Sequence, residues 1–163
     1  MPMMDALTDV LAGNMEMLKA TVADLSEQEM LIRPVPGANH AAWQLGHLAC
    51  SERSMVHAIN PGAAADLPAG FVEKFSKETA KSDDPKAFAS KEEILNALMK
   101  MRAATIAWAK TLTPADLEKP GPERMRRMAA TVGHMVAFIP SHAAMHVGQI
   151  QVLRRKLGRP VMF

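Results

Sequence analysis

Apolar residues recur every three or four positions in four segments of the chain, which is the pattern of a helix with one buried face. The segments fall within residues 4–25, 45–59, 94–112 and 132–157. Each is long enough for several helical turns and carries a single wide apolar stripe. Four such helices bury their stripes most simply by packing together, so the pattern predicts an all-α protein with a four-helix bundle.

Residues at the ends of these segments have the chemistry of helix boundaries. Asn39 is a suitable N-cap for the second helix, which is expected to stop just before Pro61. Ser90 followed by Glu93 has the spacing of a capping box that opens the third helix. The last helix is expected to cover residues 131–157, and the Gly and Pro that follow it favour a stop there.

The connection between the second and third helices is unusually long. Residues 61–90 are rich in Ala, Gly, Pro and charged side chains, with one short helix expected around residues 71–75. A connection of this length is uncommon inside a compact domain, so we expect a crossover or a lid instead of a tight turn. Residues 1–163 are expected to form a single domain, because domains usually span roughly 100–200 residues.

Composition and charge narrow the function classes. The chain has 14 Met, no Tyr and only seven aromatic residues, and its formal net charge is +2. This balance favours helices over sheets and gives no electrostatic reason to expect nucleic acid as a partner. Cys50 is the single cysteine, which excludes an internal disulfide. No apolar run is long enough for a membrane span, and Asp5 and Asp9 argue against a signal peptide, so we expect a soluble, cytoplasmic protein without a membrane partner.

Histidines provide the candidate chemistry. His142 and His146 are four residues apart on the last predicted helix, so their rings project from one face and can share a metal ion. Two histidines alone are weak evidence, and a third ligand must come from another helix. The possible donors in the sequence are His40, His47, Cys50, Glu52, His57 and His134.

Periodicity alone does not select the third ligand. At about 100° per residue, His47 lies off the main apolar stripe of the second helix and shares a minor face with His40, Trp43 and Cys50. Glu52 falls on the apolar face, where it is either a partner for a buried cation or imidazole, or a sign that the helix is rotated. The chain has no Glu-x-x-His or His-Glu-x-x-His motif, which argues against a di-iron carboxylate bundle and a common zinc protease.

Four segments carry more specific sequence: PGANH at residues 36–40, WQLGH at 43–47, HAAMHVGQI at 142–150 and LRRKLG at 153–158. Together they resemble the DinB-like superfamily of metal-dependent enzymes, and the order of the elements agrees over nearly the whole chain. The resemblance implies a four-helix bundle, a homodimer, and one divalent metal held by three histidines.

Carried over position by position, the metal ligands implied by the resemblance are His47, His142 and His146. Members of this superfamily include mycothiol- and bacillithiol-dependent transferases and a thiol-dependent isomerase. The resemblance therefore implies a small-molecule substrate, which includes the possibility of a thiol. It implies an enzyme of the hydrolase or thiol S-transferase type, in which the metal activates a water or a low-molecular-weight thiol.

Several roles remain open at the level of sequence. Imidazole ligands accept zinc, nickel, copper and iron, so the residues do not fix the metal, and Zn and Ni are the ones expected. Glu52 and Gln149 are the expected neighbours that orient an imidazole or a bound water, and His40 or His134 could carry a proton. If the Cys50 thiolate fills the fourth position, the site is closed and the protein is a non-catalytic metal-binding or stress-linked structural bundle; if water fills it, the site is open.

Overall fold

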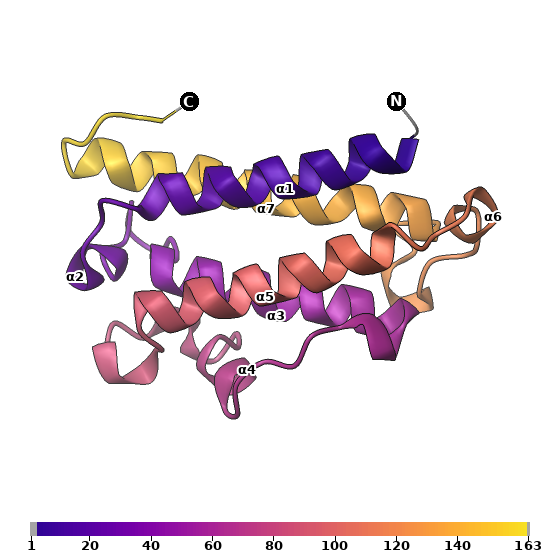
Figure 1. Ribbon diagram of the computed structural model, residues 1–163. Coiled ribbons are helices and arrows are strands. Elements are labelled where there is room, and N and C mark those ends of the chain that lie inside the picture. Colours follow the sequence, from indigo (N-terminus) through magenta and orange to yellow (C-terminus); the bar gives the residue numbers. More distant parts are fainter. Residues whose placement is uncertain (1–2, 163) are drawn as a thin grey trace.

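The structure, a computed structural model, describes residues 3–162 and is built on four long helices (Figure 1). These are α1 (Met3–Val22), α3 (Ala41–Ile59), α5 (Lys91–Ala109) and α7 (Val132–Lys156). Shorter helices lie in the connections, namely α2 (Glu27–Met30), α4 (Phe71–Lys74), α6 (Pro114–Leu117) and the 3-10 turns η1 (Pro61–Ala63), η2 (Thr79–Lys81), η3 (Pro85–Ala87) and η4 (Glu123–Met125). The all-α, four-helix prediction is confirmed, with no strand between residues 3 and 162.

The long helices pack in an order that differs from their order along the chain. Both α1 and α3 pack against α5 and α7. The first two long helices, α1 and α3, therefore lie diagonally across the bundle from each other, and so do the last two, α5 and α7. In Figure 1, α3 and α5 run in one direction, whereas α1 and α7 run in the other. None of the described helices is both long and apolar enough to cross a membrane.

The parallel course of α3 and α5 explains the long connection between them. Residues 60–90, here called the crossover, carry the chain back along the bundle so that α5 starts at the same end as α3 (Figure 1). The short helix expected around residues 71–75 is present as α4. The crossover therefore belongs to the body of the fold, where it lies against the first half of α3.

Two contacts fix the crossover beside α3. The indole Nε1 of Trp43 donates a hydrogen bond to the carbonyl of Ser76 at 3.0 Å. The ring of Phe75 lies so close to Gly46 that a Cβ built there would approach ring carbons to 2.2–2.4 Å. The absence of a side chain at position 46 thus leaves room for this phenylalanine ring.

Arg33 ties the other end of the crossover to the segment that precedes α3. Its Nε donates to Asp83 Oδ1 at 2.7 Å, and its Nη2 donates to the carbonyls of Ala80 and Ser82, each at 3.0 Å. Its Nη1 donates to the carbonyl of Ala38 at 2.8 Å. A guanidinium can satisfy four acceptors at once because its donors point in fixed and different directions.

Two of the three predicted helix starts are confirmed, and the third is displaced by one residue. Ser90 and Glu93 form the capping box of α5, and the Thr131 hydroxyl caps α7. The N-cap of α3 is His40 instead of Asn39: His40 is in the extended conformation, and its Nδ1 accepts a hydrogen bond from the backbone N–H of Trp43 at 3.0 Å.

A polar layer divides the core of the bundle into two apolar clusters. One cluster includes Leu45, Leu48 and Leu98, and the other lies around Met101 and Val136 nearer the opposite end. Between them, on three different helices, lie the buried side chains of Asn14, Glu52 and Arg102.

Glu52 and Arg102 are joined as a buried ion pair with two parallel contacts. Arg102 Nε donates to Glu52 Oε1 at 2.9 Å and Nη2 donates to Oε2 at 2.9 Å, and both side chains are 3% exposed. Arg102 Nη1 also donates to the carbonyl of Leu11 at 2.7 Å. The carboxylate on the apolar face of α3 therefore has the first of the two explanations given above, because Glu52 is paired with a buried cation.

Candidate metal centre

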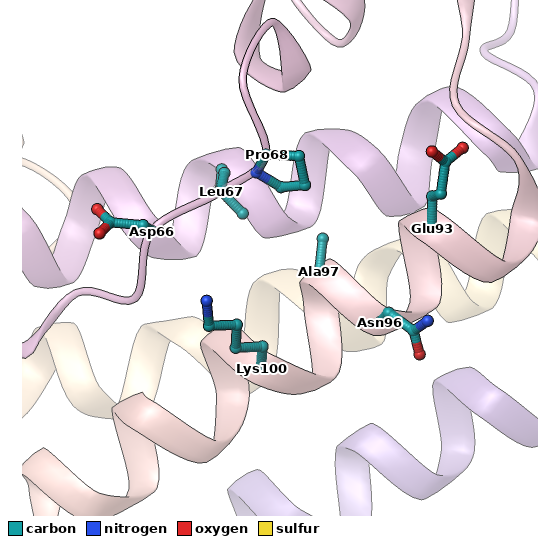
Figure 2. Close-up of a pocket in the computed structure, with 7 residues that line it drawn as sticks. All are labelled: Asp66, Leu67, Pro68, Glu93, Asn96, Ala97 and Lys100. Carbon is teal, nitrogen blue, oxygen red and sulfur yellow. The ribbon is translucent and has the colours of Figure 1, made fainter.

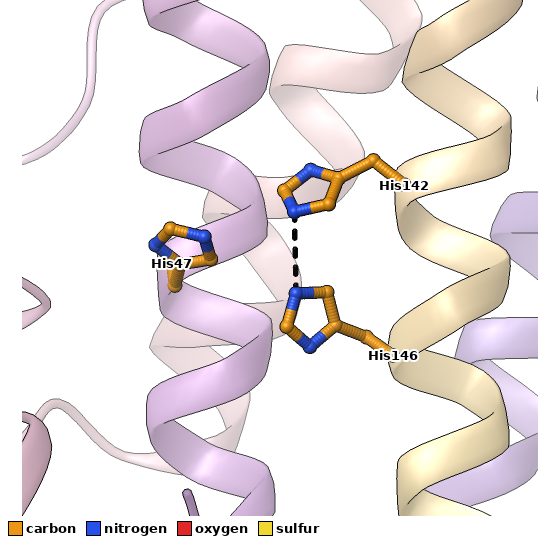
Figure 3. A group of neighbouring side chains, drawn as sticks. All are labelled: His47, His142 and His146. Carbon is orange, nitrogen blue, oxygen red and sulfur yellow. Dashed lines mark hydrogen bonds between the residues drawn. The ribbon is translucent and has the colours of Figure 1, made fainter.

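The three histidines singled out by the sequence come together between α3 and α7. Figure 3 shows His47 projecting from α3 toward His142 and His146, which project from successive turns of α7. One potential ligand atom from each residue lies within 4.8 Å of the others. The centroid of the His47 ring is 5.5 Å from the centroid of the His142 ring and 5.6 Å from that of the His146 ring.

The spacing of the ring nitrogens fits a shared metal ion. The Nε2 atoms of His142 and His146 are 3.3 Å apart (Figure 3). Two nitrogens bound to one zinc ion at about 2.0–2.1 Å and at a tetrahedral angle are separated by roughly 3.3–3.4 Å. All donors in the cluster are imidazoles, which suit zinc, nickel, copper and iron. The residues present therefore fit a divalent metal.

A buried glutamine determines which nitrogen of His146 carries the proton. Gln44 Nε2 donates to the carbonyl of Asn39 at 2.6 Å, so the amide oxygen of Gln44 faces the other way. That oxygen lies 3.0 Å from His146 Nδ1, and an amide oxygen can only accept a hydrogen bond. The proton of His146 is therefore on Nδ1, which leaves the Nε2 lone pair free to bind a metal.

The other two imidazoles are held by stacked aromatic rings. The ring of His47 lies parallel to the indole of Trp43 at 4.7 Å and 9°, and the ring of His142 lies parallel to that of Phe138 at 5.8 Å and 10°. His142 Nδ1 is buried and has no hydrogen-bond partner among residues 3–162. Stacking thus holds the planes of these two rings, in addition to the contacts that their Nε2 atoms make.

Burial keeps the three imidazoles neutral, which is the form that binds metal. Burial, the charge of His142 and the charge of Lys77 lower the pKa of His47 to about 4. Burial and the charges of His142 and His47 lower the pKa of His146 to about 4. Burial also lowers the pKa of His142, although the negative charge of Glu52 opposes this. A neutral cluster at pH 7 needs no deprotonation before a metal binds.

The remaining residues considered from the sequence lie elsewhere. Gln149 is exposed on α7, so the glutamine that orients an imidazole is Gln44, which sequence reasoning missed. Both carboxylate oxygens of Glu52 bind Arg102, and no hydrogen bond joins Glu52 to a histidine among the described residues. His57 and His134 are exposed.

Cys50, which is half-buried, and His40, which is buried, both have structural roles outside the cluster. Cys50 packs against the apolar cluster around Leu45 and Leu48, and burial raises the pKa of its thiol to about 11. It is not among the residues whose ligand atoms group with the three histidines. His40 is fully buried, contacts the ring of Phe88 at 4.6 Å and uses Nδ1 to cap α3.

A pocket of about 350 Å³ lies away from the histidines, between the crossover and α5. In Figure 2, Asp66, Leu67 and Pro68 of the crossover face Ala97 and Lys100 of α5. The histidines belong to α3 and α7, so this pocket is no part of the candidate metal centre.

Replacing Gln44 by methionine is expected to lower the metal affinity of the protein by about 10–100-fold, because His146 loses the acceptor that fixes its tautomer. Competition with a chromophoric chelator measures the affinity. Gln149→Met is the matched control, since Gln149 is exposed on the same helix as His146. Equal affinities for the two variants would contradict the assignment of Gln44.

Comparisons with known proteins agree with this fold. A model of the DinB superfamily matches residues 11–150. Among solved structures, a conserved protein from Enterococcus faecalis is 20% identical, with a TM-score of 0.75, 98% of this chain covered and 99% of that one. No curated protein matched the chain.

YfiT from Bacillus subtilis is a second similar structure. It is 19% identical with a TM-score of 0.66, and the match covers 96% of this chain and 89% of that chain. YfiT is described as "a probable metal-dependent hydrolase with an unusual four-helix bundle topology". The structural matches concern the fold, whereas the family model covers most of the sequence. The chain therefore belongs to the DinB superfamily.

Proposed function

We propose that this protein is a metal-dependent enzyme in which His47, His142 and His146 hold one divalent ion that activates a water or a low-molecular-weight thiol. The observation that carries the proposal is the convergence of three neutral imidazoles from two helices, with potential ligand atoms within 4.8 Å of one another. The similarity to YfiT, which is described as "a probable metal-dependent hydrolase", supports it. The reaction is accordingly a hydrolysis or a thiol S-transfer.

The residues around the cluster divide the work of holding such an ion. When bound, the metal supplies Lewis acidity and lowers the pKa of a water or thiol that joins it. Gln44 holds the proton of His146 on Nδ1 and so leaves Nε2 available to the metal, while Trp43 and Phe138 fix the planes of the other two rings. Three protein ligands leave at least one position for a substrate, which is typical of catalytic sites and not of structural ones. Zn and Ni remain the expected metals.

The position of Cys50 favours an open site over a closed one. A closed structural site needs a fourth protein ligand, and a thiolate is the form of cysteine that binds metal. Burial among apolar side chains raises the pKa of the Cys50 thiol to about 11, which opposes formation of the thiolate.

The first test is metal content followed by activity. We expect the protein, purified without an affinity tag and reconstituted, to retain about one divalent ion per chain in elemental analysis. The loaded protein is then assayed on a panel of esters and amides, and on electrophiles together with small thiols. Turnover that is lost on chelation and restored by Zn or Ni is the expected result. Retention of metal without turnover of any panel member would contradict the enzymatic proposal.

A further inference from the structure

Ser51 differs from three other hydroxyl residues of the long helices in what its hydroxyl contacts. Thr21, Thr105 and Ser141 each donate to the backbone carbonyl four residues earlier, at 2.7–3.1 Å, as helical hydroxyls commonly do. The Ser51 hydroxyl instead lies 3.3 Å from Nε2 of His47. Ser51 is half-buried, and among the described residues the hydrogen-bonding contact of its hydroxyl is with the imidazole of His47.

The antiparallel course of α3 and α7 places Ser51 on a particular side of the cluster. Ser51 follows His47 by one turn of α3, and His142 precedes His146 by one turn of α7. Because the two helices run in opposite directions, Ser51 is displaced from His47 in the direction in which His142 is displaced from His146 (Figure 1). The hydroxyl therefore lies on the His142 side of the cluster.

The distance from Ser51 to His47 is informative about what the hydroxyl contacts. The Ser51 hydroxyl oxygen is 3.3 Å from His47 Nε2, and the Nε2 atoms of His142 and His146 are separated by the same distance. Atoms that surround one ion stand at about this separation. A His47 Nε2 whose lone pair binds a metal cannot accept the hydroxyl proton of Ser51, which is then free for another acceptor.

We propose that the Ser51 hydroxyl binds the water or thiol that enters the histidine cluster, and donates a hydrogen bond to its oxygen or sulfur when that atom is anionic. This inference rests on the proposed function and deepens it, since it assigns a residue to the entering group. A serine in this position favours the anionic form of that group, because hydrogen bonds to charged atoms are stronger than those to neutral ones.

The experiment uses full-length protein loaded with Co²⁺ and titrated with 2-mercaptoethanol and, separately, with azide. Visible absorption of the cobalt reports binding of each probe without any need for turnover. Ser51→Ala is expected to raise the dissociation constant of both probes roughly tenfold or more, the loss that a hydrogen bond to a charged atom implies. Its Co²⁺ affinity is expected to stay within about threefold of wild type, since no ligand nitrogen is removed.

Two further variants separate this role from a structural one. Ser51→Thr keeps the hydroxyl and is expected to restore probe affinity. Ser54→Ala is the matched control on α3, because Ser54 accepts a hydrogen bond from Arg124 at 2.9 Å instead of contacting a histidine. Its probe affinity is expected to equal that of wild type.

Each other outcome identifies what has failed. Unchanged probe affinity in Ser51→Ala, or an equal loss in Ser54→Ala, overturns the assignment of Ser51 while leaving the proposed function intact. A loss of Co²⁺ affinity in Ser51→Ala equal to that of a histidine variant also overturns it, because Ser51 is then part of the metal-binding set. Failure of wild-type protein to bind Co²⁺ overturns the proposed function at the first step, and this inference with it.

Discussion

The His146→Ala variant is expected to lose the metal almost completely. His146 is the most buried of the three histidines, at 8% exposure, and the one whose tautomer the protein fixes through Gln44. Its removal deletes a ligand and leaves two rings, His47 and His142, on opposite helices. Loss of an outer hydrogen-bond partner lowers metal affinity by roughly 10–100-fold, and the loss in His146→Ala should be larger than this. Elemental analysis after desalting measures the remaining stoichiometry.

The control for this variant is His57→Ala, which removes an exposed histidine of α3 outside the cluster. It is expected to retain about one metal ion per chain. Circular dichroism and thermal unfolding of the two metal-free proteins exclude a general loss of structure as the cause. Full metal content in His146→Ala would show that these histidines do not form the binding site.

The Glu52→Gln variant is expected to lower the free energy of unfolding by about 3–5 kcal/mol, because it leaves the Arg102 guanidinium buried without a counter-charge. Both side chains are 3% exposed and sit in the polar layer between the two apolar clusters. Water cannot replace the lost carboxylate at that depth as it would at a surface. Urea unfolding of metal-free protein, followed by circular dichroism, measures the change.

A double replacement distinguishes the unpaired charge from lost packing. Glu52→Leu combined with Arg102→Met removes both charges and keeps similar volume, so it is expected to be clearly more stable than Glu52→Gln alone. The same helix has no exposed carboxylate, so the salt bridge of Lys19 with Glu16 on α1, whose side chains are 40% and 70% exposed, serves as the surface reference. Glu16→Gln should change the free energy of unfolding by at most about 1 kcal/mol. A Glu52→Gln variant as mildly affected as this would contradict the explanation.

The four helices were predictable because their signal is local. An apolar stripe with a 3.6-residue period and a capping box are both read within a few turns, and Ser90 with Glu93 forms the predicted cap. The predicted start of α3 was wrong by one residue, because histidine is not among the side chains most favoured as N-caps, whereas asparagine, which precedes His40 in the sequence, is. The parallel course of α3 and α5 was less accessible, since a crossover and a lid have similar composition.

The surroundings of the histidines were less predictable, because they depend on how helices rotate against each other. Gln44 and Gln149 each lie three residues from a motif histidine, and the sequence alone does not say which faces inward. A polar Gln44 between Trp43 and Leu45 was the available signal, since a buried amide needs partners on both ends. The cation paired with Glu52 comes from a helix fifty residues away, beyond the reach of any periodic pattern.

The diagonal placement of consecutive long helices has a consequence for how fast the chain folds. In a bundle made of helical hairpins, each helix meets its sequence neighbour first, and low contact order gives folding in microseconds to milliseconds. Here α1 packs against α5 and α7, and α3 meets α5 only after the crossover has closed. Every major helix interface thus requires a long loop to close before it forms. Folding should accordingly be slow for an all-α protein, and the pairing of His47 with α7 should be among its last events, after the C-terminal helix has docked.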